Sequence, residues 1–198
     1  GDVYKRQVED LKTLRHTGSY LQGHPDMKHI PGVDMSSGSL GQGISAAVGM
    51  ALSAKLSNED YRVYTLLGDG EIQEGQVWEA AMFAGNKGLS NLTAFVDYNN
   101  LQIDGTIEEV NSAAPIDKKF EAFGWHVITI DGHSFEEIEN ALKEAETVDK
   151  PVAIIAKTVK GKGVSFMENA VGWHGSAPND EQYEQAMTEL NAALAALN

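Results

Sequence analysis

The chain has 198 residues, 42% of them hydrophobic, and its 29 Asp and Glu against 15 Lys and Arg give a formal charge of −14. This acidity disfavours nucleic acid and anionic membranes as partners, because both carry negative charge. No apolar run approaches the roughly 18 residues of a membrane span, the first residues lack the apolar stretch of a secretory leader, and the absence of cysteine excludes disulfides and thiolate chemistry, so we expect an acidic cytoplasmic globular protein.

The chain is predicted to divide into two regions. Residues 1–20 are predicted to be a leader with a short helix, and residues 1–7 are set aside as a possible non-native remnant because they show no periodicity. Residues 21–198 are predicted to form one globular domain. This domain begins with Leu21–Ser39, which is rich in Gly, Pro, His and Ser and is typical of a long loop. Long loops in compact domains are commonly functional or disordered.

Beyond this loop, apolar periodicity alternates between helical and strand patterns. Helices are predicted over Leu40–Leu56, Gln76–Gly88, Ile116–Phe123 and Ser134–Glu146, with a capping box at Ser134–Glu137, and strands over Tyr61–Leu67, Leu92–Asp97, Trp125–Ile130 and Pro151–Thr158. A loop over Lys160–Gly175 precedes a final helix capped by Asn179 or Asp180. The alternation predicts an α/β fold with a parallel sheet and helices on both faces.

Polar loops follow three of the predicted strands. They are Gly68–Gly70, Asp97–Asn100 and Lys157–Gly163. Ligands of parallel α/β sheets bind beyond the carboxyl ends of the strands, so these loops are the candidate site. Glycines on both sides of Asp69 allow a sharp turn and a close approach of phosphate to the backbone, although the same tripeptide is also an ordinary turn.

Asp69 and Asn99 are predicted to face one crevice. The 28 residues between Gly70 and Asn99 allow one helix and one strand, which places the second strand beside or close to the first. A carboxylate, an amide oxygen and a backbone carbonyl suit Mg²⁺ or Ca²⁺. Because Mg²⁺ completes its coordination with water and substrate phosphates, the pattern predicts a metal-held diphosphate rather than a closed ion site.

Three motifs resemble those of transketolases, especially the N-terminal subunits of split transketolases. They are Ser37–Ile44, Gly68–Gly75 and Asp97–Gly105, and the resemblance extends over Gly23–Leu194. It implies the diphosphate-side (PP-type) domain of the thiamine diphosphate-binding fold. It also implies a transferase that moves a two-carbon ketol unit from a ketose phosphate to an aldose phosphate.

The resemblance also implies the cofactor and metal residues. Asp69 and Asn99 would bind Mg²⁺ or Ca²⁺ through their side chains, and Leu101 through its carbonyl. Gly70 would offer its amide to the diphosphate. The full set implied for the cofactor is Gly38, Leu40, Gly68, Asp69, Gly70, Glu71, Asn99, Ile103, Lys160 and His174. Of these, Gly38 and Leu40 would line the aminopyrimidine and thiazolium, and Ile103 would press on the thiazolium.

Three residues, one of them His174 from the cofactor set, would act in catalysis. By the resemblance, His24 would contact the substrate, His174 would lie near the diphosphate and the donor sugar, and Glu74 would belong to an acidic network that links paired sites across a dimer. The basic cluster of Lys157, Lys160 and Lys162 is either a solvated loop or a phosphate anchor, with Lys160 the preferred anchor. The remaining histidines match no motif and are expected to be structural; they are His16, His29, His126 and His133.

The sequence departs from the transketolase pattern in two ways. A second Gly-His-Pro motif is expected further toward the N-terminus, and nothing before Leu21 supplies it. The pyrimidine-binding domain, with its activating glutamate, does not fit within 198 residues. Three alternatives therefore stay open: an enzyme subunit that needs a separate pyrimidine-domain chain, in a homodimer or heterotetramer; a non-catalytic cofactor-binding module; or a truncated fragment that is inactive alone.

Overall fold

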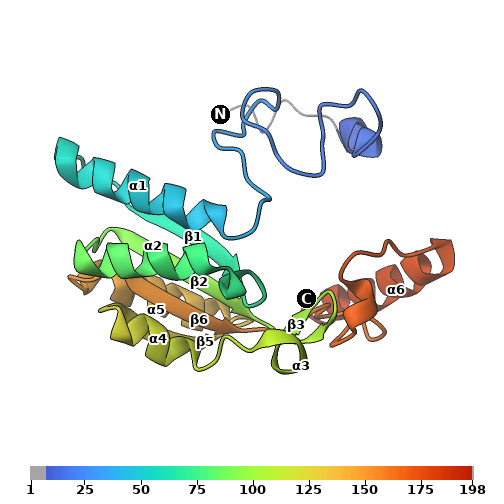
Figure 1. Cartoon of the computed structure of the whole chain (residues 1–198). Coiled ribbons are helices and arrows are strands. Elements are labelled where there is room, and N and C mark those ends of the chain that lie inside the picture. The colour runs from blue at the N-terminus through green and yellow to red at the C-terminus, as the bar shows by residue number, and fades with distance from the viewer. Residues whose placement is uncertain (1–7, 198) are drawn as a thin grey trace.

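A four-stranded parallel sheet forms the centre of the molecule. The computed structural model describes residues 8–197, so the predicted remnant at residues 1–7 lies outside the described residues (Figure 1). The strand order is β1 (Val63–Gly68), β2 (Leu92–Tyr98), β6 (Val152–Lys157) and β5 (His126–Asp131). β1 and β2 are direct neighbours, with Gly68 opposite Asp97, which confirms the placement of these two strand ends side by side.

Helices cover both faces of this sheet, as predicted. α1 (Gln42–Ser57), α2 (Gly75–Asn86) and α4 (Ile116–Ala122) pack on one face, and α5 (Phe135–Thr147) packs on the other (Figure 1). β6 is buried on both faces from Val152 to Ala156, which explains its unbroken apolar sequence.

The two faces of the sheet are not covered equally at β1. This strand lies at an edge of the sheet, and Leu67 points into the core beneath α1 and α2. Tyr64 and Leu66 point to the opposite face, where they are 51% and 71% exposed. Because α5 packs against β5 and β6, it does not reach them.

The ends of two helices test the predicted caps. Ser134 is the N-cap of α5, and its hydroxyl accepts the backbone N–H of Glu137. The reciprocal bond of the predicted capping box does not form, because the Glu137 carboxylate accepts the backbone N–H of Asp131 instead. α6 (Asp180–Ala196) is capped by Asn179, which forms a complete box with Gln182.

Several short elements were not predicted. A hairpin of β3 (Leu101–Gln102) and β4 (Gly105–Thr106) follows β2 directly, and α3 (Ile107–Asn111) follows the hairpin. The 3-10 helices η3 (Glu71–Gln73) and η4 (Val171–Trp173) were not predicted either, whereas η2 (Val8–Thr13) lies within residues 1–20, where a short helix was expected. β3, α3 and α6 all lie at the carboxyl edge of the sheet (Figure 1). Among the described helices, none has the length and apolar character to cross a membrane.

Candidate functional site

Asp69 is a buried carboxylate at the carboxyl edge of the sheet. It follows β1 directly and is 1% exposed. Its Oδ1 accepts the N–H of Gly70 at 2.9 Å, and its Oδ2 accepts the N–H of Asn100 at 2.5 Å. Burial raises the pKa of Asp69, the two backbone donors oppose this effect, and the neighbouring charge of Asp97 adds to it. A cation beside this carboxylate would offset the cost of its burial.

The backbone folds so that the turn at Asn99 and Asn100 lies next to Asp69, and Leu101 follows this turn. Asn99 Oδ1 accepts the N–H of Leu101 at 3.0 Å, and Asn100 adopts a left-handed conformation with φ of 63°. The bond from Asn100 to Asp69 joins this turn to the loop after β1. The candidate metal-binding atoms of Asp69, Asn99 and Leu101 are all oxygens, and only the Asp69 carboxylate carries a formal charge. Such a set fits a hard cation that completes its coordination with atoms of a bound ligand. The described residues hold no cluster of three or more His, Asp or Glu side chains that could bind a metal alone.

Gly70 and Ile103 lie beside this carboxylate turn. The amide of Gly70 donates to Asp69, and a Cβ at Gly70 would lie 3.2 Å from Gln102 Oε1, so only glycine fits without a shift of that side chain. Ile103 lies between β3 and β4 at the tip of the hairpin and is 64% exposed. An exposed apolar side chain at this edge is available to cover a bound ligand.

His24, Gly38 and Leu40 form a second group. Gly38 has φ of +107°, and a Cβ there would lie 2.7 Å from Cγ of His24, so the imidazole packs directly on the glycine backbone. Leu40, just before α1, is 62% exposed. A cavity of about 440 Å³ runs along β1, and its lining includes Gly38, Leu40 and Glu71. Its volume falls within the range of small-molecule sites.

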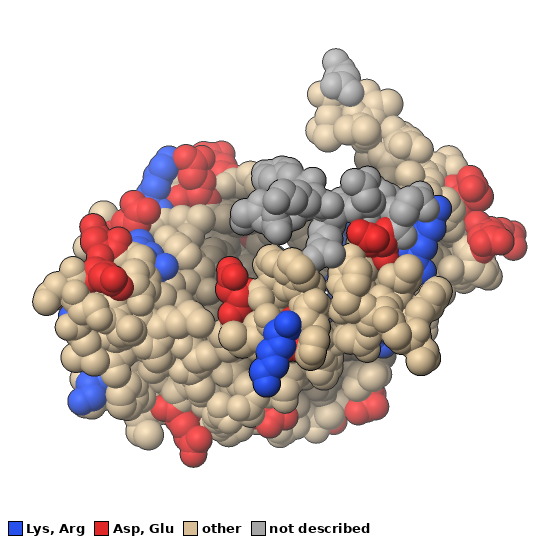
Figure 2. Space-filling view, turned by 90° about the horizontal axis from the view of Figure 1, so that it is seen from above, with Lys and Arg blue, Asp and Glu red and all other residues tan. Residues whose placement is uncertain are grey.

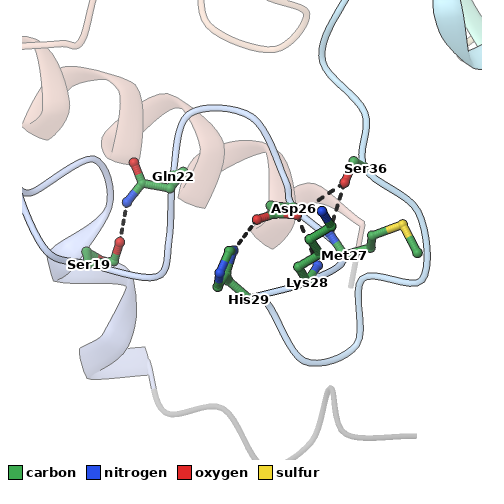
Figure 3. A network of polar contacts seen from close by, with 7 residues as sticks. All are labelled: Ser19, Gln22, Asp26, Met27, Lys28, His29 and Ser36. Atoms are coloured by element: carbon green, nitrogen blue, oxygen red, sulfur yellow. Dashed lines mark hydrogen bonds and ion pairs between the residues drawn. The ribbon is translucent and has the colours of Figure 1, made fainter.

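The loop that carries His24 is held by Asp26. Asp26 Oδ1 accepts the N–H of Lys28 at 3.0 Å and the hydroxyl of Ser36 at 3.3 Å, while Oδ2 pairs with His29 (Figure 3). The hydrogen bonds from Lys28 and His29 lower the pKa of Asp26. Because Asp26 binds Ser36 across ten residues, it closes the loop and holds His24 near Gly38. His29 thus pairs with the residue that closes this loop.

Glu71 joins the two groups. Its Oε1 accepts the N–H of Gly41 at 2.9 Å, and its Oε2 accepts the N–H of Gly68 at 3.1 Å. These bonds tie the segment that contains Gly38 and Leu40 to the end of β1. Both oxygens of Glu71, which was grouped with the cofactor ligands, thus bind backbone. Glu74 is the exposed N-cap of α2 and makes no capping bond through its side chain.

Lys160 and His174 belong to a third region, after β6. Lys160 is half-buried and forms no ion pair with a described residue, whereas Lys162 lies 4.0 Å from Glu168. His174 follows η4 and is exposed. Within the described chain its ring makes no hydrogen bond to the other candidate residues. The structure thus joins the Asp69 and His24 groups through Glu71 but does not join His174 to either.

Three contributors were not found from the sequence. Asp97 accepts the backbone N–H of Asp69, Gln102 packs against Gly70, and Asp26 closes the His24 loop. Asp97 begins the motif Asp97–Gly105, just before Asn99. This position is the feature of the sequence that could have identified it. Gln102 and Asp26 act through contacts that span loops, which no local pattern encodes.

The sequence and the fold match a known class of protein. Residues 2–193 match the family described as transketolase, thiamine diphosphate binding domain, and the chain belongs to this family. It is 48% identical over 184 residues to a 6-deoxy-6-sulfo-D-fructose transketolase subunit of Clostridium, covering 92% of this chain and 67% of that protein. It is 44% identical over 190 residues to an apulose-4-phosphate transketolase subunit of Phocaeicola vulgatus, covering 96% of this chain and 66% of that protein.

Solved structures agree with this assignment. The transketolase of Campylobacter jejuni superposes with a TM-score of 0.87 at 37% identity, covering 92% of this chain and 30% of that chain. The chain therefore spans about two thirds of the length of the subunit relatives and under a third of that full-length transketolase. The four-stranded parallel sheet with flanking helices corresponds to the N-terminal part of such enzymes.

Proposed function

We propose that this chain is the diphosphate-side subunit of a two-subunit transketolase. It binds thiamine diphosphate with Mg²⁺ or Ca²⁺ and takes part in transfer of a two-carbon ketol unit from a ketose phosphate to an aldose phosphate. The observation that carries the proposal is the buried carboxylate of Asp69, bound to the Asn99–Asn100 turn at the ends of two neighbouring strands. The similarity to named transketolase subunits over more than 90% of the chain supports it.

Under this proposal, different residues contact the metal, the diphosphate and the rings of the cofactor. Asp69 and Asn99 hold the metal through side-chain oxygens and Leu101 through its carbonyl. Gly68, Gly70 and Lys160 surround the diphosphate, and Gly38, Leu40 and Ile103 lie against the rings; these nine residues with Glu71 and His174 complete the cofactor site. When bound, thiamine diphosphate supplies a nucleophilic thiazolium carbon that holds the two-carbon unit.

Proton movement is assigned to side chains that can gain and lose a proton. His24 binds and polarises substrate hydroxyl and carbonyl oxygens, and His174 does so on the diphosphate side. Glu74, exposed at the start of α2, contributes a carboxylate to the contact between paired sites. Each is a catalytic residue of the assembled enzyme under this proposal.

A partner chain completes the enzyme. The relatives are named as subunits, and the glutamate that activates the aminopyrimidine is expected on a separate pyrimidine-binding chain. We propose a homodimer of this chain or a heterotetramer with that partner, acting on sugar phosphates in the cytoplasm. Residues 21–198 form the cofactor-binding domain under this proposal, and the boundary at residue 20 stays a prediction.

Calorimetric titration of the chain with thiamine diphosphate tests the proposal. Saturable binding is expected with Mg²⁺ and is expected to disappear with EDTA and in Asp69→Ala. Asp60→Ala, which changes an exposed aspartate in the loop before β1, is the matched control and should bind as the wild type does. If the folded chain binds no cofactor, or if binding survives EDTA and Asp69→Ala, the proposed metal-held site is wrong.

Activity distinguishes a catalytic role from that of a non-catalytic module. The isolated chain is expected to show no ketol transfer, and addition of a pyrimidine-domain chain is expected to produce it. Transfer by the pure isolated chain at the rate of a complete enzyme would contradict the need for a partner. Cofactor binding with no transfer in the presence of that partner would favour the module.

A further inference from the structure

Three strand ends converge on the two residues that precede Lys160 in the loop after β6, Thr158 and Val159. Thr158 donates its N–H to the carbonyl of Tyr98 at 3.2 Å and its hydroxyl to Oδ1 of Asp97, both at the end of β2. On the other side, beyond the end of β5, His133 Nε2 accepts the N–H of Val159 at 2.8 Å. Segments on both sides of β6 therefore hold the backbone that leads into Lys160.

Asp97 also connects Thr158 to the backbone of Asp69, the proposed metal ligand. The carbonyl of Asp97 accepts the backbone N–H of Asp69 at 3.2 Å, while the Asp97 side chain accepts from Thr158. A continuous path thus runs from His133 through Val159, Thr158 and Asp97 to Asp69. It crosses the carboxyl edge of the sheet in the strand order β5, β6, β2, β1.

We propose that Asp97 and His133 are positioning residues that hold Lys160 at a fixed place relative to Asp69, so that its ammonium meets the diphosphate group of the ligand. The carboxyl-edge clamp is the set Asp97, His133, Thr158 and Val159. The inference rests on the proposed function, because that function supplies the diphosphate. It assigns a role to His133, which matched no motif.

The packing around the clamp leaves the backbone little freedom. A Cβ at Gly132 would lie 2.5 Å from Cγ2 of Thr158, and the N–H of Gly132 donates to the carbonyl of Lys157 at 2.8 Å. On the far side, the carbonyl of Lys160 accepts the N–H of Asn169 at 2.9 Å. The backbone of Lys160 is therefore fixed from both directions, while its ammonium has no ion-pair partner among the described residues.

A fixed backbone matters most for a lysine. The side chain is long and flexible, and ordering it on a ligand costs conformational entropy. A prepositioned Cα restricts the ammonium to a smaller volume before the ligand arrives. Loss of the clamp would add the cost of ordering the loop to the cost of ordering the side chain.

The chemistry of His133 provides a matched pair of variants. An imidazole nitrogen that accepts a hydrogen bond carries no proton, so His133 must hold its proton on Nδ1. Glutamine has an acceptor oxygen at nearly the same reach and can replace Nε2, whereas alanine cannot. His133→Gln should therefore rescue what His133→Ala loses, which a role in packing alone would not produce.

The first measurement is hydrogen exchange of the Val159 amide in the whole chain without ligand, followed by NMR. A net hydrogen bond contributes about 1 kcal/mol, so exchange is expected to rise about fivefold in His133→Ala and to stay near the wild-type rate in His133→Gln. His16→Ala, an exposed histidine, is the control. Unchanged exchange in His133→Ala, or equal exchange in the alanine and glutamine variants, overturns the clamp.

The second measurement is thiamine diphosphate affinity in Mg²⁺ for His133→Ala, Lys160→Ala and the double variant. Each single variant is expected to weaken binding about tenfold, and the double variant no more than Lys160→Ala alone. An additive double variant overturns the route through Lys160, and so does a Lys160→Ala chain with wild-type affinity. If the wild type binds no cofactor, the proposed function fails, and the exchange measurement by itself decides whether the clamp exists.

Discussion

Asp69 shows how one residue combines two opposing demands. Under the proposed function its carboxylate must be charged to hold a cation, yet it is almost fully removed from solvent. Two backbone N–H groups stabilise the charge, but burial outweighs them and raises the pKa above its ordinary value of 3.8. In the folded chain without ligand, this carboxyl therefore binds a proton more readily than it does in the unfolded chain.

The affinity for Mg²⁺ and thiamine diphosphate is expected to fall as pH decreases from neutral through the raised pKa of Asp69, because protons then compete with the metal. The effect of pH on folding stability is opposite in sign to that of a salt-bridged carboxylate, whose pKa is lowered in the folded state. A raised folded pKa means that the contribution of Asp69 to stability is greatest below 3.8 and declines as pH rises through the folded value.

Titrations in two buffers of different ionisation enthalpy measure the protons released on binding. Release is expected to increase on the acidic side of neutrality. Binding without proton release at every pH at which the chain stays folded would contradict a raised pKa of Asp69 at the proposed site.

Glu71 is the second residue whose environment predicts a measurable effect. Glu71→Ala leaves the N–H groups of Gly41 and Gly68 without partners, and an unsatisfied buried donor costs about 1–3 kcal/mol. Glu71→Gln keeps one acceptor and should lose less. Both variants should also weaken cofactor binding, since the segment with Gly38 and Leu40 is released.

Urea denaturation gives the loss of stability, and calorimetry gives the loss of affinity. Glu79→Ala on the exposed side of α2 is the control and should leave both unchanged. A Glu71→Ala chain as stable as the wild type would show that these two hydrogen bonds are not maintained in solution.

At the scale of elements, the long structures follow from sequence and the short ones do not. β6 is predicted because burial on both faces requires an unbroken apolar run, and α1 because its buried positions recur at helical spacing. β3 and β4 have two residues each, too few to show any period, so the hairpin that positions Ile103 was not predicted.

The same reasoning applies to the candidate site. Asp69 and Asn99 follow long strands that local patterns identify, so their proximity could be predicted from topology. The bonds of Glu71 to Gly41 and of His133 to Val159 join residues 30 and 26 positions apart through loops. Loop conformation depends on tertiary contacts, and therefore these roles required the structure.

A substitution at the tip of the β3–β4 hairpin is expected to change cofactor affinity without changing the free energy of unfolding. Ile103→Ala should change the free energy of unfolding by less than about 0.5 kcal/mol, because the side chain is already exposed. If Ile103 covers the cofactor, its truncation removes apolar contact that forms only on binding, and affinity should fall about tenfold. Denaturation and calorimetry on the same sample test both parts, and an unchanged affinity would remove Ile103 from the site.

At the scale of the whole molecule, charge governs association between copies. The chain has a formal charge of −14, and acidic side chains are spread over the face in Figure 2 rather than gathered in one place. Two such molecules repel one another over a distance set by the screening length, about 30 Å at 0.01 M salt and about 8 Å at 0.15 M.

Self-association is therefore expected to strengthen as salt rises over this range, in contrast to association with a basic partner, which should weaken. Sedimentation equilibrium of the chain at the two salt concentrations measures the effect. A dimer whose dissociation constant does not depend on salt would show that charge repulsion plays no part in its assembly.

The uneven covering of β1 has a practical consequence for anyone who prepares the protein. A strand at a sheet edge with Tyr64 and Leu66 in solvent is a template onto which unrelated or misfolded chains can add. Concentrated stocks should therefore lose material to precipitation over days of storage. A lysine in place of Leu66 is expected to slow this loss, and because Leu66 also lines the cavity along β1, cofactor affinity should be measured on the same variant.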